Sequence, residues 1–139
     1  MKTHRHKLKF PVFGDYVVKV VFCENIHNEA KRLKLDLPSG VDKDEVAYTA
    51  ITPSGCTCVF DFNPGAETIV HEAYHAVAAL LKFSGANADE ELVAYHLGYL
   101  AGHITKWRDN AQAVRGDTRQ ADSRGETQKG SPSNCGQNL

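Results

Sequence analysis

The sequence predicts an α+β fold in which a small antiparallel sheet of two hairpins packs against two helices. Two pairs of short segments rich in β-branched and aromatic residues, at 8–22 and 45–62, are each joined by a turn. An almost wholly apolar stretch follows at 68–81, and a second stretch with helical spacing begins near Ala88. The expected element order is β-β-α-β-β-α-α.

The first hairpin is expected to have strands at 8–13 and 16–22 around a Gly14-Asp15 turn. Pro11 places the first of these strands at a sheet edge, because proline has no N–H to donate to a neighbouring strand. The apolar spacing over about 25–35 then suits a short amphipathic helix, which residues 36–40 end.

The second hairpin is expected to have strands at 45–51 and 56–62 around the turn Thr52-Pro53-Ser54-Gly55. Its second strand runs directly into the apolar helix, so we expect this strand to offer an edge to which an extended peptide can add. Cys56 and Cys58 share one face of the strand. We interpret them as packing residues, because zinc motifs usually separate paired cysteines by two or more positions.

The limits of the two later helices are marked by capping signals. Asn63 is the expected N-cap of the central helix, with Pro64 at its first position, and Gly85 ends it. Asn87 and Glu90 have the spacing of a capping box for the last helix, expected over about 88–107. Small residues predict a close approach of the two helices; they are Ala78, Ala79, Ala94, Gly98 and Gly102.

Length and composition predict one domain at residues 1–107, followed by a disordered polar tail at 108–139 that has almost no large apolar side chain. Sixteen Lys and Arg against 17 Asp and Glu give a net charge of -1, so we expect neither nucleic acid nor a membrane as partner. We interpret the basic residues Lys2, Arg5, Lys7 and Lys9 as a solvated terminus. The N-terminus lacks the apolar core of a signal peptide, and we expect a cytoplasmic protein.

The central helix carries the motif His71-Glu72-x-x-His75. The two histidines are one helical turn apart and project from the same face, where both imidazoles can bind one metal ion. A carboxylate in a run otherwise suited to a core is costly to bury unless it binds a proton, a water or a partner. The motif therefore predicts a metal site with a carboxylate beside it, and a third ligand on a neighbouring element would complete it.

The third metal ligand is expected on the last helix, where two arguments point to different residues. Glu90 has a local role if it completes a capping box, which leaves Glu91 as the ligand. If the two helices form a straight antiparallel hairpin, however, the residue level with His75 is closer to His96, at a rise of about 1.5 Å per residue. The sequence leaves Glu91, His96 and Glu90 as alternatives.

The sequence H-E-A-Y-H at 71–75, followed by E-L-V-A-Y at 91–95, resembles the gluzincin zinc metallopeptidases. It is similar in layout to small metallopeptidases of bacteriophages and prophages, to minimal gluzincins and to ImmA/IrrE-type peptidases. The resemblance implies a zincin-like fold, a zinc ion held by His71, His75 and Glu91, and Glu72 as catalytic base. It also implies an oxyanion-stabilising residue further along the chain; the candidates are Tyr95, His96, Tyr99 and His103.

The expected function is hydrolysis of a peptide bond in a peptide or protein substrate by a zinc-bound water that Glu72 activates. Such a protein would act in the host cytoplasm if it is encoded by a phage. The alternative is a non-catalytic, zinc-stabilised inhibitor or adaptor in which the metal only ties two helices together. A structural site of that kind has no need of a base beside an open coordination position.

Overall fold

The computed structural model describes residues 2–10, 15–36 and 46–125, with side chains described as far as 116. Four strands form one sheet in the order β1-β2-β4-β3; they are β1 (His4–Lys9), β2 (Val17–Phe22), β3 (Ala47–Thr52) and β4 (Gly55–Phe60). The predicted α+β class and the antiparallel pairing of strands within each predicted hairpin are confirmed. The bounds of the first strand are wrong, because β1 spans His4–Lys9 instead of 8–13 and so includes the basic residues expected in a solvated terminus; residues 11–14 of that prediction lie outside the described residues. The prediction of a purely antiparallel sheet is wrong, because β2 and β4 pair in parallel.

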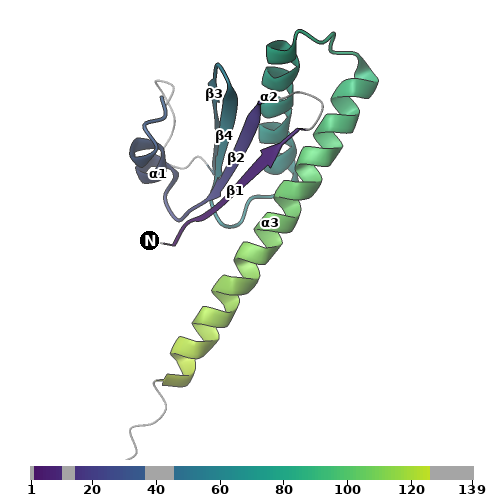
Figure 1. Ribbon diagram of the computed structural model, residues 1–139. Coiled ribbons are helices and arrows are strands. Elements are labelled where there is room, and N and C mark those ends of the chain that lie inside the picture. Colours follow the sequence, from purple (N-terminus) through teal and green to yellow (C-terminus); the bar gives the residue numbers. More distant parts are fainter. Residues whose placement is uncertain (1, 11–14, 37–45, 126–139) are drawn as a thin grey trace, which may run out of the picture.

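The helices lie on both sides of this sheet (Figure 1). The short helix α1 (Ile26–Arg32) covers part of one face, and α2 (Ala66–Ser84) and α3 (Glu90–Gly125) cover the other. The main core lies between the sheet and these two long helices. Its fully buried members include Phe22, Phe60, Ile69, Leu80, Leu81, Leu100 and Ile104.

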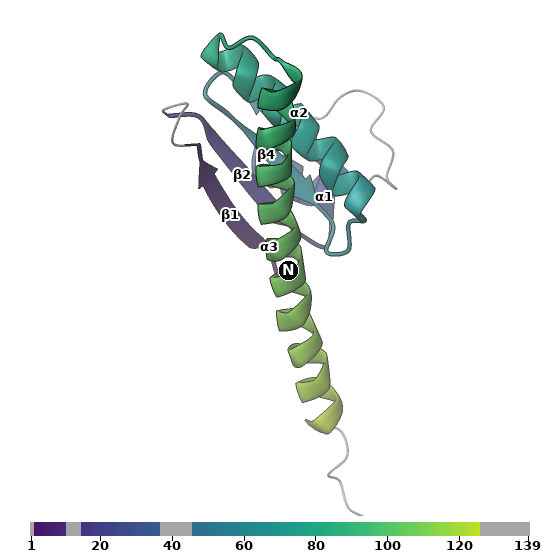
Figure 2. The same cartoon turned by 90° about the vertical axis from the view of Figure 1, so that its right-hand side faces the viewer.

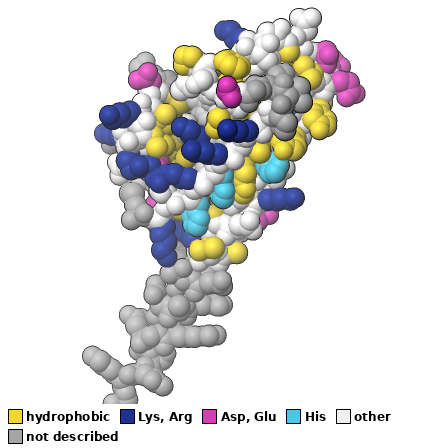
Figure 3. Space-filling model, viewed as in Figure 1, with side chains coloured by type: hydrophobic (Ala, Val, Ile, Leu, Met, Phe, Trp, Pro, Cys, Tyr) yellow, Lys and Arg dark blue, Asp and Glu magenta, His cyan; other side chains and the backbone are white. Residues whose placement is uncertain are grey.

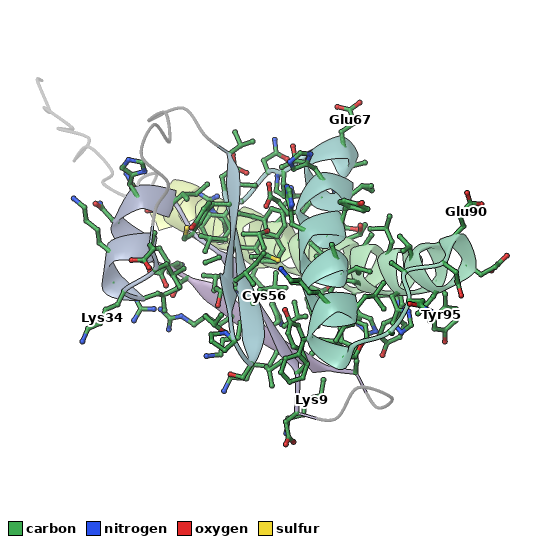
Figure 4. The ribbon with its side chains drawn as sticks, turned by 90° about the horizontal axis from the view of Figure 1, so that it is seen from above. Lys9, Lys34, Cys56, Glu67, Glu90 and Tyr95 are labelled. Carbon is green, nitrogen blue, oxygen red and sulfur yellow. The ribbon has the colours of Figure 1, made fainter. Side chains whose placement is uncertain are left out.

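Strand β4 occupies the interior of the sheet, so the expectation that it offers a free edge is wrong. All six of its residues are buried, which is the pattern of a strand covered on both faces. The edges are β1, as predicted, and β3. Cys56 and Cys58 of β4 are buried in the main core, which confirms their interpretation as packing residues. Figure 4 shows Cys56 between the sheet and α2.

The ends of the long helices differ in detail from the predictions. Gly85 ends α2 in the left-handed conformation, as expected, but the N-cap of α2 is Gly65 rather than Asn63. At the start of α3, the Asp89 carboxylate accepts a hydrogen bond of 2.7 Å from the backbone N–H of Leu92. Asp89 therefore caps this helix in place of Asn87, and the capping argument that separated Glu90 from Glu91 fails.

Helix α3 continues to Gly125, so the prediction of disorder from Arg108 is wrong for residues 108–125. Its extension packs on the turn that precedes α2: Arg108 Nη1 donates to the carbonyl of Pro64 at 3.1 Å, and Gln112 Nε2 donates to that of Phe62 at 3.1 Å. Ala111 is buried between these anchors. Residues 126–139 of the predicted tail lie outside the described residues.

The seam between α2 and α3 is made by large side chains rather than small ones. Leu100 and Ile104 of α3 are fully buried in the main core, with Val93 and Leu97 packed against it, as their spacing predicts. Gly98 and Gly102 instead face solvent with open space around them, and the prediction of a seam of small residues is wrong. Figure 2 shows α3 passing across the body of the molecule and projecting beyond it.

Among the described residues, none of the helices combines the length and the apolar character that crossing a bilayer requires.

Candidate metal centre

His71 and His75 lie on the solvent-facing side of α2, with their Nε2 atoms 3.1 Å apart. The nitrogen ligands of a tetrahedral zinc ion, each at 2.0–2.1 Å from the metal, are separated by about 3.3 Å. The two imidazoles therefore fit two adjacent positions around one zinc ion. This confirms that the i, i+4 spacing brings the two rings together, as the sequence predicts.

Glu72 points from α2 toward the sheet and is 8% exposed. Thr49 Oγ1, on the edge strand β3, donates a hydrogen bond to Glu72 Oε2. The Cys58 thiol lies 3.5 Å from the same hydroxyl, and its hydrogen bond with Cys56, then its burial and the nearby Glu72, raise the pKa of that thiol. The thiol is therefore neutral beside the carboxylate.

His71 and Glu72 line one hollow of about 340 Å³, whose other walls come from the start of β3 and the first turn of α2. Among the described residues, Glu67 is the other acidic residue lining this hollow. It is exposed and projects from the first turn of α2, one helical turn before His71 (Figure 4). The site therefore opens along β3, at one edge of the sheet.

Glu91 lies in the first turn of α3 and is exposed. Ser84, the last residue of α2, is 13 residues beyond His71, or roughly 20 Å along the helix axis. Because α3 begins just beyond that end of α2, Glu91 lies far from the imidazole pair. Figure 4 shows the neighbouring Glu90 at the start of α3, well apart from Glu67 at the start of α2.

His96 of α3, the second candidate ligand, is buried on the side of the core where β1 lies. Its Nδ1 lies 2.8 Å from the carbonyl oxygen of Leu92, and its ring packs against Phe10 just beyond β1. β1 and β3 are the two opposite edges of the sheet, so His96 and the His71–His75 pair lie on different sides. Nowhere in the described part of the chain do three His, Cys, Asp or Glu side chains gather in a way that could hold a metal ion.

The candidates for oxyanion stabilisation also lie on the β1 side. The Tyr99 ring contacts Phe10, and the His103 ring lies between Tyr99 and Trp107, which stacks on His6 of β1. Tyr95, at 69% exposure, is in the second turn of α3 and contacts His96. These rings form a row along α3 that does not include the imidazole pair.

Edge strand β3 offers backbone groups beside the site. The Asp61 N–H donates to the Val46 carbonyl at 3.0 Å, which makes Val46 and Asp61 a hydrogen-bonded pair of the antiparallel ladder. Because such pairs alternate, the N–H and C=O groups of Ala47, Thr49 and Ile51 point away from β4. These groups pair with no described strand, and Thr49 is the residue that also contacts Glu72.

Exposed apolar side chains surround this edge. Those that lie on β3, just before it or on α2 are Val46, Ile51, Val70, Tyr74 and Phe83. Ile51 and Phe83 line a second hollow, of about 640 Å³, which has His75 on its wall and Lys82 beside it.

Comparison of the chain with protein-family models, with curated proteins and with solved structures finds no match.

The sequence analysis missed Thr49 and the role of β3. Alternation along the predicted strand places Thr49 on one face with Ala47 and Ile51. That this face meets Glu72 is seen only in the structure, where β3 lies at the sheet edge and Thr49 contacts Glu72. The strand order itself has no local signal, because both hairpins look alike in sequence.

Proposed function

We propose that this chain is a zinc-dependent peptidase in which His71 and His75 hold the metal ion and Glu72 is the catalytic base. The observation that carries the proposal is the combination of two converging imidazoles with a buried carboxylate at a free strand edge. A satisfied pair of core histidines would not need a buried acid next to it.

Each residue of the motif has a separate task. Zinc, when bound, supplies a Lewis acid that polarises the scissile carbonyl and lowers the pKa of water toward about 7. Glu72 takes a proton from the attacking water and returns it to the leaving amine nitrogen. Since Thr49 already binds Oε2 of Glu72, Oε1 is the atom that exchanges the proton.

The substrate is proposed to be an extended peptide that adds to β3, not to β4 as the sequence suggested. The outward N–H and C=O groups of Ala47, Thr49 and Ile51 would pair with its backbone. Its side chains would meet the exposed apolar groups around the site, among them Ile51, Tyr74 and Phe83. We therefore expect a preference for apolar residues around the scissile bond.

The ligand set needs a third protein group to match catalytic zinc sites. Glu91, which the resemblance implies, is one candidate, and Glu67, which lines the same hollow as His71, is the other. We favour Glu67, because a side-chain rotation moves its carboxylate toward His71 whereas Glu91 requires movement of α3.

A non-catalytic protein in which zinc ties α2 to α3 is the competing function. It requires a ligand from α3 beside the imidazole pair, and the described part of α3 supplies none. It also leaves the burial of Glu72 unexplained.

The test measures zinc content and hydrolysis of an unfolded protein substrate on the same preparations. We expect His71→Ala to lose both, and Glu72→Gln to keep zinc and lose hydrolysis. Loss of zinc in Glu67→Ala but not in Glu91→Ala would support the ligand assignment. Full hydrolysis by Glu72→Gln, or no zinc in the wild-type protein after supply of the metal, would rule out the proposed function.

A further inference from the structure

A second surface, on the face of the sheet opposite to α2 and α3, concentrates positive charge. On β1, alternate residues point to the face of the sheet that α1 covers only in part. The exposed cations on this face are Arg5, Lys7 and Lys9 of β1, Lys19 of β2 and Lys34 just after α1. Figure 3 shows dark blue side chains gathered over this part of the molecule. We call these five residues the basic face.

The basic face surrounds a hollow of about 540 Å³. Its lining includes the apolar residues Val17, Val21, Leu33 and Leu35 and the hydroxyl residues Thr52, Ser54 and Thr57. Asp15 is the one acidic residue that lines it among those the structure describes. The near-neutral charge of the whole chain therefore conceals a strongly cationic concave surface.

Two of the lysines oppose each other directly across the sheet. Lys7 of β1 and Lys19 of β2 are register partners, and Arg5 and Lys9 are the diagonal neighbours of Lys19. Like charges in directly opposed positions destabilise a sheet. Within the described ranges, Lys7, Lys9, Lys19 and Lys34 form no ion pair with a carboxylate, so this repulsion is not offset inside the described protein.

Protection of an edge strand against aggregation is the simplest reason for lysines on β1. It does not account for Lys19, which lies on the interior strand β2, or for Lys34, which follows a helix. The facing positions of Lys7 and Lys19 are instead explained if an anion binds between the two ammonium groups, because it removes their repulsion.

We propose that the basic face binds the phosphate backbone of single-stranded nucleic acid. The available cations are lysines, compact point charges suited to phosphate, whereas the arginine that would best grip a carboxylate already pairs with Glu29. Successive cations on β1 are about 6.6–6.8 Å apart, so they present a row of charge to a polymer. The cations surround a hollow, and a hollow favours a single flexible strand over the convex surface of a rigid duplex.

Binding would depend on phosphates and not on base identity, because the imidazole of His6, the ring among the described lining residues, is already stacked on Trp107. The inference stands on the basic face alone and does not rest on the proposed peptidase activity.

The test measures anisotropy of labelled oligothymidylate and oligouridylate of about 12 nucleotides with the full chain, at salt concentrations from about 50 to 200 mM. Three to four lysine–phosphate contacts predict a slope of log K against log[salt] of about -2 to -3. Lys7→Gln/Lys19→Gln should weaken binding at least tenfold and make the slope shallower by about 1.4. The matched control is Lys31→Gln/Lys106→Gln, which removes two exposed lysines outside the basic face and should bind as the wild type does.

Thermal unfolding of the free variants excludes misfolding as the cause. Lys7→Gln/Lys19→Gln should be at least as stable as the wild type, because it removes a repulsive pair. No binding by the wild type, or equal affinity and slope in the two double variants, would overturn the proposal. Two competition results would also overturn it. If hexaglutamate displaces the oligonucleotide as well as unlabelled oligonucleotide does, the ligand is an acidic peptide. If thymidine monophosphate does so, the ligand is a small phosphate compound.

Discussion

Thr49 on edge strand β3 holds the carboxylate of Glu72 on helix α2 by a hydrogen bond between the two elements. This contact joins the strand proposed to bind substrate with the proposed base. It also provides a polar partner for a carboxylate that is 8% exposed, which would otherwise be costly to bury. The hydroxyl therefore fixes which carboxylate oxygen faces the hollow beside His71.

Replacement of that hydroxyl tests its positioning role. Thr49→Val keeps the side-chain shape and should lower kcat/KM about tenfold, which corresponds to about 1.4 kcal/mol, with little change in KM. Zinc content should stay at the wild-type level, because Thr49 is not a ligand. Thr49→Ser retains the hydroxyl and should restore most of the activity; equal loss in both variants would indicate a packing effect.

Glu29 predicts how stability depends on pH. Arg32 donates two hydrogen bonds to this carboxylate, at 2.6 and 2.9 Å, and Arg5 donates one at 3.0 Å. These bonds, that from Arg32 first, lower the pKa of Glu29 to about 2 in the fold, against burial, which raises it. A lowered pKa stabilises the fold above the ordinary carboxyl range, and that stabilisation is lost as the pH falls from about 4.5 to about 2.

We therefore expect Glu29→Gln to lower the free energy of unfolding by about 2 kcal/mol at neutral pH. The difference from the wild type should shrink through that acidic range and disappear near its lower end. Urea denaturation at a series of pH values measures it. A constant difference at every pH would mean that the charge of Glu29 does not contribute to stability.

The parts of the fold that sequence predicted are those with strong local signals. Both hairpins, the amphipathic pattern of α3 at Leu100 and Ile104, and the Gly85 terminus follow from turn residues and periodicity. The i, i+4 histidine pair follows for the same reason, since one helical turn fixes its geometry. None of these predictions required knowledge of distant contacts.

Apart from the N-caps expected at Asn63 and Asn87, which are local, the parts that failed depend on how elements meet. Parallel pairing of β2 with β4, the edge position of β3 and the flank of α2 on which α3 lies are long-range choices. These choices place Glu91 and His96 away from the imidazole pair and bring Thr49 to Glu72. The extension of α3 was missed because a polar helix has no periodic apolar signal; its anchors are single contacts such as that of Gln112.

The helical extension beyond Trp107 predicts a difference between two neighbouring alanines. Ala111 is 2% exposed and belongs to the main core, whereas Ala113, two positions on, is exposed. Ala111→Glu would bury an unpaired charge or detach the helix, and we expect it to lower the free energy of unfolding by about 3 kcal/mol. Ala113→Glu should change stability by less than about 0.5 kcal/mol. Equal effects in guanidinium denaturation would mean that this part of α3 is not packed on the domain.

Two glycines give the last prediction, with effects of opposite sign. A Cβ on Gly55 would overlap the carbonyl oxygen of Val17 on β2, which belongs to the backbone and cannot rotate away. Gly55→Ala should therefore lower the free energy of unfolding by about 2 kcal/mol or more. A Cβ on Gly98 meets open space on the exposed side of α3.

Gly98→Ala should raise the free energy of unfolding by about 0.5–1 kcal/mol, because alanine loses less backbone entropy than glycine in a helix. Chemical denaturation of the two variants measures both effects on one scale. A seam of small residues between α2 and α3, as the sequence suggested, predicts the reverse sign at Gly98, because any Cβ there would push the helices apart. The sign of this one change therefore distinguishes the two ways of packing α3, and with them the flank of α2 on which a third zinc ligand must be sought.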